Sequence, residues 1–114
     1  MDIKDLVSII LPKEVSDNFE LTCIEKSTTE RLDIYLDELS VLPEGEGIYL
    51  SKGFTSYSSV QDYPLRGKAV YLHIRRRKWQ EQSTGAIVCR TFDITHEGTR
   101  ISKEFAAFLK EAYR

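Results

Sequence analysis

The sequence has little of what disulfide-bonded or zinc-binding domains depend on. Only 2 of its 114 residues are cysteines, and Cys23 and Cys89 are far apart with no pairing pattern. A structural zinc site needs closely spaced ligand pairs such as Cys-x-x-Cys. Cys89, His73 and His96 instead stand singly in the chain. We therefore expect a reduced, cytoplasmic protein without a bound metal or other cofactor.

Long hydrophobic runs are also missing. No stretch approaches the ~20 apolar residues of a membrane-spanning helix. The early apolar patch at 6–11 is interrupted by Ser8 and lacks a basic leader, so we expect no signal peptide. A composition that is 41% hydrophobic and 30% charged fits a globular domain rather than a disordered tail. The length predicts one domain, residues 1–114.

Positive charge is scarce in the first half of the chain and abundant in the second. Residues 1–62 hold 5 basic and 13 acidic residues, a balance of −8, whereas residues 63–114 hold 11 basic and 5 acidic residues, a balance of +6. The net charge of −2 conceals this difference. Such an asymmetry favours a basic face that binds nucleic acid, with a different role for the acidic half.

Residues 1–41 read as an acidic segment formed by a helix and a hairpin. Apolar residues at helical spacing predict a short helix over 3–11, capped by Asp2 and ended by Pro12, with a brief helical turn at 13–18. Alternation predicts strands at 19–25 and 32–37, paired as a hairpin through a polar turn at 26–30. Residues 42–68 are rich in glycine and proline, so we expect a long loop that is functional, mobile or partly stranded.

Residues 69–114 read as a basic hairpin followed by a helix. Alternation predicts a strand over 69–79, a turn at 82–85 and a strand at 86–94. Gly98 breaks the chain before a helix that Thr99 or Ser102 caps. The helix has an apolar stripe made of Ile101, Phe105, Phe108, Leu109 and Ala112. The predicted fold class is α+β: a small antiparallel sheet of two β-hairpins, a short N-terminal helix and an amphipathic C-terminal helix, with Phe105 buried.

Four consecutive cations, Arg75 to Lys78, precede Trp79 and are the main candidate site. Guanidinium groups bind phosphates with two hydrogen bonds, and aromatic rings stack on bases or sugars. On the predicted strand, Arg75 and Arg77 share a face with Tyr71, His73 and Trp79. Two interpretations remain open: a DNA-binding surface, or a solvated strand end whose arginines pair with the acidic half. The candidate DNA-binding residues are Arg66, Lys68, Arg75, Arg76, Arg77, Lys78, Trp79, Arg90, Arg100 and Lys103.

The sequence contains little evidence for a catalytic site. Cys89 and His73 could approach across the second hairpin, but no motif marks an oxyanion hole or an orienting third group. Gly45 and Gly47 form only a G-x-G without the strand-to-helix context of a phosphate loop. Four carboxylates are scattered along the chain and read as solvated or salt-bridged: Asp62, Asp93, Glu97 and Glu104. We therefore expect a protein that is not an enzyme, with no catalytic residues.

Four stretches carry a resemblance to a known family. They are SKGF at 51–54, QDYPLRGK at 61–68, VYLHIRRRKW at 70–79 and EGTRISKEFAAFLKE at 97–111. Together they resemble the N-terminal region protein of ISAon-type insertion-sequence transposases, in which a separate reading frame carries the catalytic domain. The same stretches are similar to the zinc-ribbon N-terminal region of ISL-group transposases. The ribbon cysteines of that group have no counterparts between Gln80 and Val88.

The resemblance implies a non-catalytic DNA-binding component of a bacterial insertion-sequence transposase, active in transposition and DNA recombination of a mobile element. It implies that the basic strand, Arg75 to Trp79, faces DNA and that Thr99, Arg100 and Lys103 open a helix whose N-terminus favours phosphate. The implied partners are transposon-end DNA and the catalytic subunit, and a homodimer is a further candidate assembly. The alternative function is a module that docks the catalytic subunit without contacting DNA.

Overall fold

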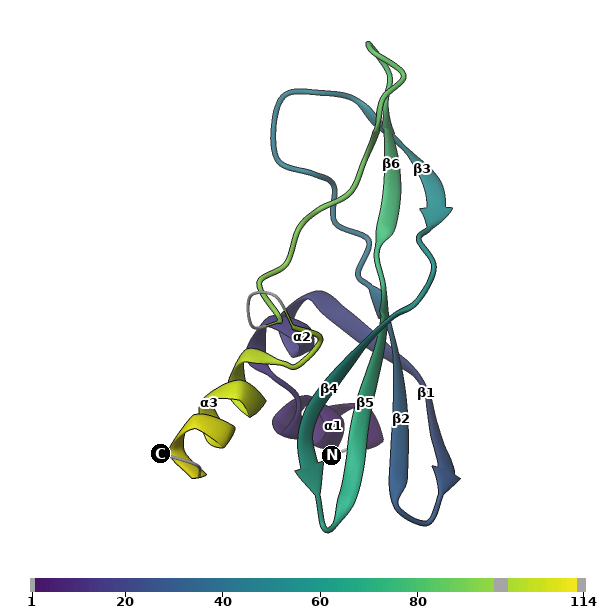
Figure 1. Cartoon of the computed structure of the whole chain (residues 1–114). Helices are drawn as coiled ribbons and strands as arrows, with labels where there is room; N and C mark the ends of the chain where they lie inside the picture. Colours follow the sequence, from purple (N-terminus) through teal and green to yellow (C-terminus); the bar gives the residue numbers. More distant parts are fainter. Residues whose placement is uncertain (1, 96–98, 113–114) are drawn as a thin grey trace.

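The computed structural model describes residues 2–95 and 99–112 and shows the predicted α+β fold class (Figure 1). The strands form two sheets rather than the single antiparallel sheet expected from the sequence. Strand order is β1-β2-β5-β4 in the larger sheet and β3-β6-β7 in the smaller one. The sequence predictions that fall on His96, Glu97 and Gly98, and on the side chain of Ala112, lie outside the described part of the chain.

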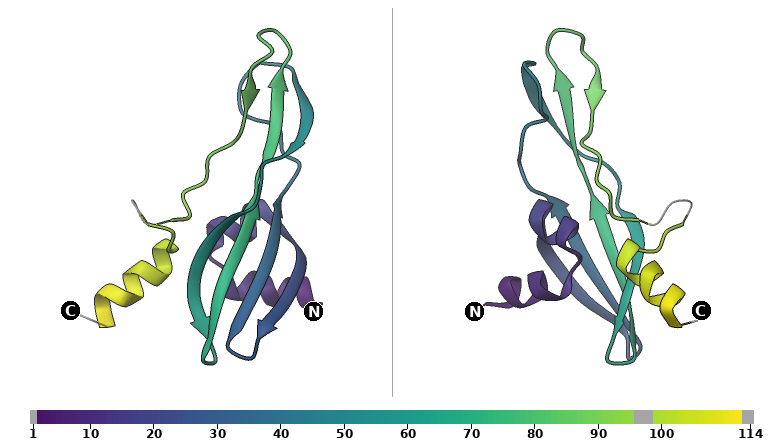
Figure 2. Two further views of the ribbon diagram at one scale, coloured as in Figure 1. Left: turned by 45° about the vertical axis from the view of Figure 1, so that its right-hand side comes forward. Right: turned by 90° about the vertical axis from the view of Figure 1, so that its left-hand side faces the viewer.

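The N-terminal helices follow the sequence prediction closely. Helix α1 (Ile3–Ile10) begins at Asp2, which forms a reciprocal capping box with Asp5. Helix α2 (Lys13–Asn18) starts directly after Pro12. Both helices lie on one face of the larger sheet (Figure 2), where their buried residues join the hydrophobic core. The helical residues buried there are Val7 and Val15.

The larger sheet begins with the predicted hairpin. Strand β1 (Phe19–Thr28) pairs antiparallel with β2 (Arg31–Glu38). Strand β2 then pairs parallel with β5 (Lys68–Arg75), so the sheet is mixed rather than wholly antiparallel. The inward residues of these strands, together with Val60, form the core; its fully buried members include Ile34, Leu36 and Leu72.

The predicted long loop at 42–68 contains two strands, which explains the parallel pairing. Strand β3 (Tyr49–Phe54) belongs to the smaller sheet, and β4 (Ser58–Leu65) returns to the larger one, where it forms a hairpin with β5. This excursion lets β5 run in the same direction as β2. Of the alternatives expected for 42–68, the structure shows the partly stranded one.

The second predicted hairpin is divided and shortened. The expected strand over 69–79 is interrupted at Arg76, so β6 (Arg77–Glu81) belongs to the smaller sheet. The expected strand at 86–94 is reduced to β7 (Ile87–Val88). The physical reason is that the chain after β7 leaves the smaller sheet and returns to the core, where Phe92 and Ile94 pack.

Helix α3 (Lys103–Ala112) packs beside β4 and is capped by Ser102. The Phe105 amide donates to Ser102 Oγ over 3.1 Å. Ser102 Oγ in turn donates to the buried Asp62 carboxylate over 2.6 Å. Phe105 is buried, which confirms the sequence prediction, whereas Phe108 is 40% exposed and contacts the Tyr63 ring.

Candidate nucleic-acid interface

The first arginine of the basic run is held by a carboxylate of β2. Parallel pairing places Arg75 beside Asp37. The Arg75 guanidinium donates to both Asp37 oxygens, with distances of 2.7 and 2.8 Å. It also lies over the Phe54 and Tyr57 rings. These hydrogen bonds hold the pKa of the Asp37 carboxyl below its usual range.

Two further arginines converge on the fully buried Glu38. The Arg77 amide donates to Glu38 Oε1 over 2.9 Å, and the Arg77 side chain donates to the Glu38 carbonyl over 2.8 Å. Arg90 Nη1 lies 3.5 Å from Glu38 Oε2. Because Glu38 ends β2 while Arg77 begins β6, these contacts join the larger sheet to the smaller one. Pairing with the acidic half is therefore what the structure shows for Arg75, Arg77 and Arg90.

Two other candidate DNA-binding residues, Trp79 and Lys103, make contacts within the protein itself. The Trp79 ring is 5% exposed, and its buried Nε1 has no hydrogen-bond partner among the described atoms. Lys103 pairs with Asp93 at the surface, beside the start of α3. The indole is consequently not displayed for stacking at the surface.

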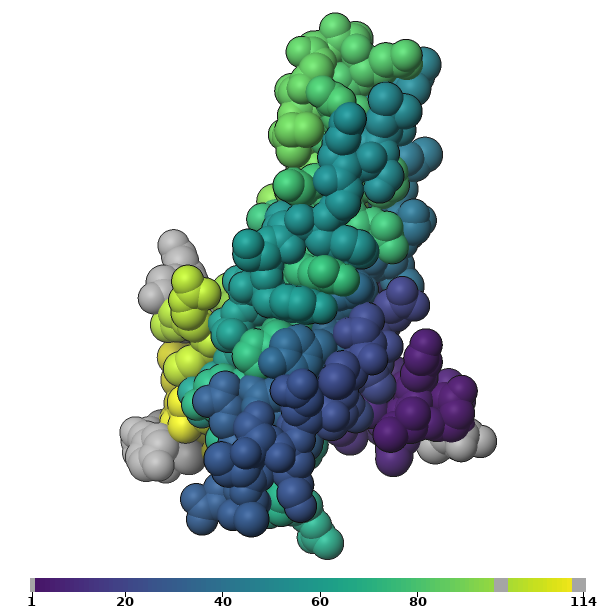
Figure 3. All heavy atoms as spheres, turned by 90° about the vertical axis from the view of Figure 1, so that its right-hand side faces the viewer, coloured from purple at the N-terminus to yellow at the C-terminus, as the bar shows by residue number. Residues whose placement is uncertain are grey.

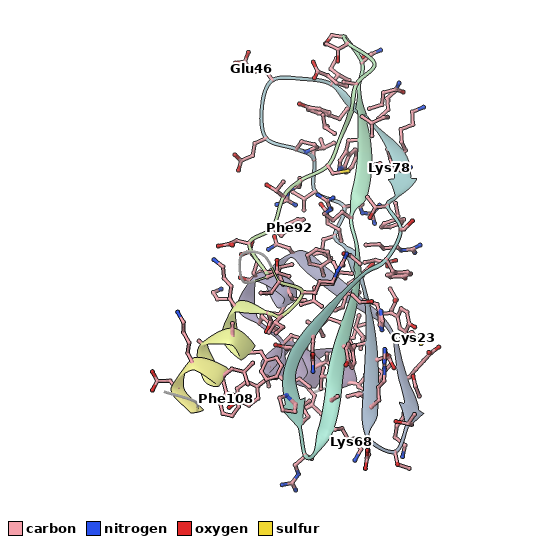
Figure 4. The ribbon with its side chains drawn as sticks, viewed as in Figure 1. Cys23, Glu46, Lys68, Lys78, Phe92 and Phe108 are labelled. Atoms are coloured by element: carbon pink, nitrogen blue, oxygen red, sulfur yellow. The ribbon has the colours of Figure 1, made fainter. Side chains whose placement is uncertain are left out.

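The remaining candidate cations face solvent or a surface groove. Arg66 lies in the β4–β5 turn with a φ of 53°, and Gly67 separates it from Lys68, the first residue of β5. Lys78 lies on β6, next to buried Trp79, so strand alternation directs it to the opposite face (Figure 4). Within the described residues, Arg66, Lys68, Lys78 and Arg100 have no ion-pair partner.

The smaller sheet forms a projecting arm, which we define as residues 49–54 and 77–88. It extends from the larger sheet along the length of a molecule that measures 49 × 34 × 24 Å (Figure 3). Ser51 lies opposite Trp79, and the register shifts between Ser51 and Phe54. Lys52 follows Ser51 and is exposed, so the open face of the arm presents Lys52 and Lys78.

Lys52 was not among the residues singled out from the sequence. One feature of the sequence could have identified Lys52: it is the one cation between Arg31 and Arg66, in an otherwise acidic stretch. The carboxylates that hold the arginines were also missed. Asp33 and Asp37 alternate along β2 and therefore share its outward face, a pattern that could have identified them.

The outward face of the larger sheet carries a serine–histidine–aspartate line. Ser59 Oγ lies 2.9 Å from His73 Nδ1, and His73 Nε2 lies 2.6 Å from Asp33 Oδ1. Arg31 also donates to Asp33, over 2.9 and 3.1 Å, and the Tyr35 ring stacks on His73. Because Arg31 already neutralises the carboxylate, Asp33 is poorly suited to stabilising an imidazolium during catalysis. We interpret the line as a structural cross-strand network.

No three histidine, cysteine, aspartate or glutamate side chains converge as metal ligands in the part of the chain that the structure describes. None of the helices among the described residues is long and apolar enough to cross a membrane. Comparison with protein-family models, curated protein sequences and solved structures found no significant match to this chain.

Proposed function

We propose that the chain is a non-catalytic DNA-binding component of a bacterial insertion-sequence transposition system, acting in the cytoplasm on transposon DNA and positioning a separate catalytic subunit. The observation that carries the proposal is the arm, a narrow β-ribbon that presents Lys52 and Lys78 on its open face. The resemblance of residues 51–111 to ISAon-type N-terminal region proteins supplies the context of transposition.

A β-ribbon such as the arm is an element that the major groove of DNA accommodates. The major groove, about 12 Å wide, admits a two-stranded β-ribbon. Over most of its length the arm is the β3–β6 pair, because β7 has only 2 residues. Lysines on the open face reach phosphates on the groove walls, and the exposed Leu50 and Ile87 side chains can contact thymine methyl groups.

The arm lysines are tested by the salt dependence of DNA binding. Replacing Lys52 and Lys78 together by alanine removes two expected phosphate contacts. The slope of log K against log salt should become shallower by about 1.8, since each contact contributes ~0.9. The measurement is fluorescence anisotropy with a transposon-end duplex.

A matched control replaces Lys4 and Lys110, two exposed lysines on the helices, and keeps the net charge of the arm variant. This control should retain the slope of the unaltered chain. An arm variant that binds DNA with the affinity and slope of the unaltered chain would contradict the proposed binding mode.

A second candidate function is docking of the catalytic subunit, and helix α1 favours it. Ile3, Leu6 and Ile9 are 62%, 54% and 67% exposed, so the helix presents aliphatic groups to solvent. Replacing Leu6 and Ile9 by aspartate should abolish co-purification with the catalytic subunit while DNA binding is kept. Unchanged co-purification of that variant, with its melting temperature preserved, would exclude docking through α1.

A further inference from the structure

We infer that a groove beside β4 binds the phosphodiester backbone of nucleic acid. The inference rests on the proposed function, because it assigns a second set of phosphate contacts on the same DNA. The groove consists of two adjoining hollows of about 540 and 360 Å³, which share Ser58, Val60 and Thr95 in their walls. Arg76 lines the larger hollow and Arg100 lines the smaller one.

The walls of the groove have a chemistry suited to anions. Both hollows are lined by arginine and by hydroxyl groups, and their described lining residues include no aspartate or glutamate. This composition is notable in a chain with 18 acidic residues. Arginine and hydroxyl donors are the side chains that commonly contact DNA phosphates. The wall hydroxyls belong to Thr55, Ser56, Ser58, Ser59, Thr91 and Thr95, among others.

The arginine of the larger hollow is positioned by its surroundings. The Arg76 amide donates to Thr55 Oγ1 over 3.0 Å, and the Thr55 amide donates to the Arg76 carbonyl over 2.8 Å. Arg76 Nη1 donates to the Arg90 carbonyl over 3.0 Å, which leaves the other guanidinium nitrogen donors for a ligand. Fixing the side chain before binding lowers the entropy lost when a phosphate is bound.

The arginine of the smaller hollow is anchored through its backbone. The Gln61 amide donates to the Arg100 carbonyl over 2.9 Å, and the Ser102 amide donates to the Gln61 carbonyl over 2.9 Å. These bonds attach residues 100–102 to the edge of β4. The Arg100 backbone therefore has a defined position along the groove, and its exposed side chain extends from this anchored point.

Part of the lining of the larger hollow is apolar. It includes Val60, Ile74, Phe92 and Ile94, and Phe92 packs edge-on against Phe19 with ring centroids 4.9 Å apart. A lining that combines apolar groups with arginine and hydroxyl groups matches a sugar–phosphate chain, whose deoxyribose faces are largely apolar. A single small phosphate would occupy one hollow, whereas a nucleic-acid strand can contact Arg76 and Arg100 together.

The test compares a groove variant, Arg76→Gln with Arg100→Ala, with a control, Lys4→Ala with Lys110→Ala. Both lose two positive charges, but the control residues are exposed on helices α1 and α3 and lie outside the groove lining. The groove variant should have a salt slope for duplex DNA shallower by about 1.8, while the control keeps the original slope. Melting temperatures establish that both variants are folded.

A titration followed by the amide NMR signals of Ser58 and Thr95 separates the sources of phosphate. These signals should shift with a short duplex and not with inorganic phosphate at the same phosphate concentration. Equal shifts of these amide signals with inorganic phosphate would overturn the assignment of the groove to nucleic acid.

Suppose that the groove variant keeps the salt slope of the unaltered chain while the slope of the arm variant becomes shallower: the groove inference then fails and the proposed function stands. If the unaltered chain binds no DNA, the groove inference and the proposed function both fail.

Discussion

At the scale of single residues, the carboxylates of β2 decide which arginines are available to a ligand. Asp33 is 2% exposed, and the hydrogen bonds from Arg31, followed by those from His73 and Ser27, hold its pKa well below the usual range. Asp37 has its pKa lowered chiefly by Arg75. Each carboxylate therefore stabilises the fold only when it is ionised.

Replacing Asp33 by asparagine should lower the free energy of unfolding by about 1.5–3 kcal/mol, because buried hydrogen bonds to a charged group are lost. The measurement is chemical denaturation at neutral pH. Asp93→Asn is the matched control, since Asp93 and its partner Lys103 have side chains 74% and 51% exposed. The control should change the stability by less than about 0.5 kcal/mol. Equal effects of the two changes would contradict the structural role of Asp33.

The lowered pKa values also predict the direction of the pH dependence. The unfolded carboxyls take up protons near their ordinary pKa of about 4, whereas folded Asp33 and Asp37 resist protonation. Their contribution to stability is therefore complete above that pH and is lost as the pH falls below it. The stability difference between the unaltered chain and Asp33→Asn should shrink on acidification from pH 6 to about 3. If this stability difference grows as the pH falls, the predicted direction of the pH dependence is wrong.

At the scale of elements, helix α3 depends on contacts that are distant in sequence. Its cap, Ser102, donates to Asp62 on β4, and Phe105 packs near Tyr63 of the same strand. Strand β4 was not predicted, because its sequence is polar and contains Pro64. Only Val60 and Asp62 of this strand are buried, and a buried aspartate is acceptable there because Ser102 supplies its partner.

Phe105→Ala should lower the free energy of unfolding by about 3–5 kcal/mol, because Phe105 is buried against β4. Phe108→Ala, on the same helix, is the control and should cost clearly less, since Phe108 is 40% exposed. Thermal melting monitored by circular dichroism compares the two. A larger effect at Phe108 would mean that the packing of α3 differs from the structure described here.

The elements that the sequence predicts are those with strong local signals. Apolar residues at helical spacing and the Asp2 cap predict α1, and the alternation of apolar and polar residues around Ile34 and Leu36 predicts the first hairpin. The break at Arg76 could not be predicted, because it arises where one chain segment joins two sheets. The pairing of Arg75 with Asp37 depends on the parallel register of β2 and β5, which local patterns do not encode.

At the scale of the whole molecule, the pairing of some arginines with the acidic half is compatible with our proposal that other cations bind DNA. Arg75 pairs with Asp37 within the larger sheet, whereas Arg77 and Arg90 contact Glu38 where the larger sheet meets the arm. Lys52 and Lys78 on the arm and Arg76 and Arg100 in the groove are the cations to which we assign DNA contacts. The net charge of −2 therefore does not oppose DNA binding, because positive charge is concentrated locally.

The most direct test of DNA binding is the salt dependence of the unaltered chain with a transposon-end duplex. Four phosphate contacts, from Lys52, Lys78, Arg76 and Arg100, predict a slope of log K against log salt of about −3.6. Fluorescence anisotropy between about 50 and 200 mM salt measures this slope. A slope near the predicted value would support the assignment of these residues. Absence of binding at low salt, or binding that does not change across this range, would contradict it.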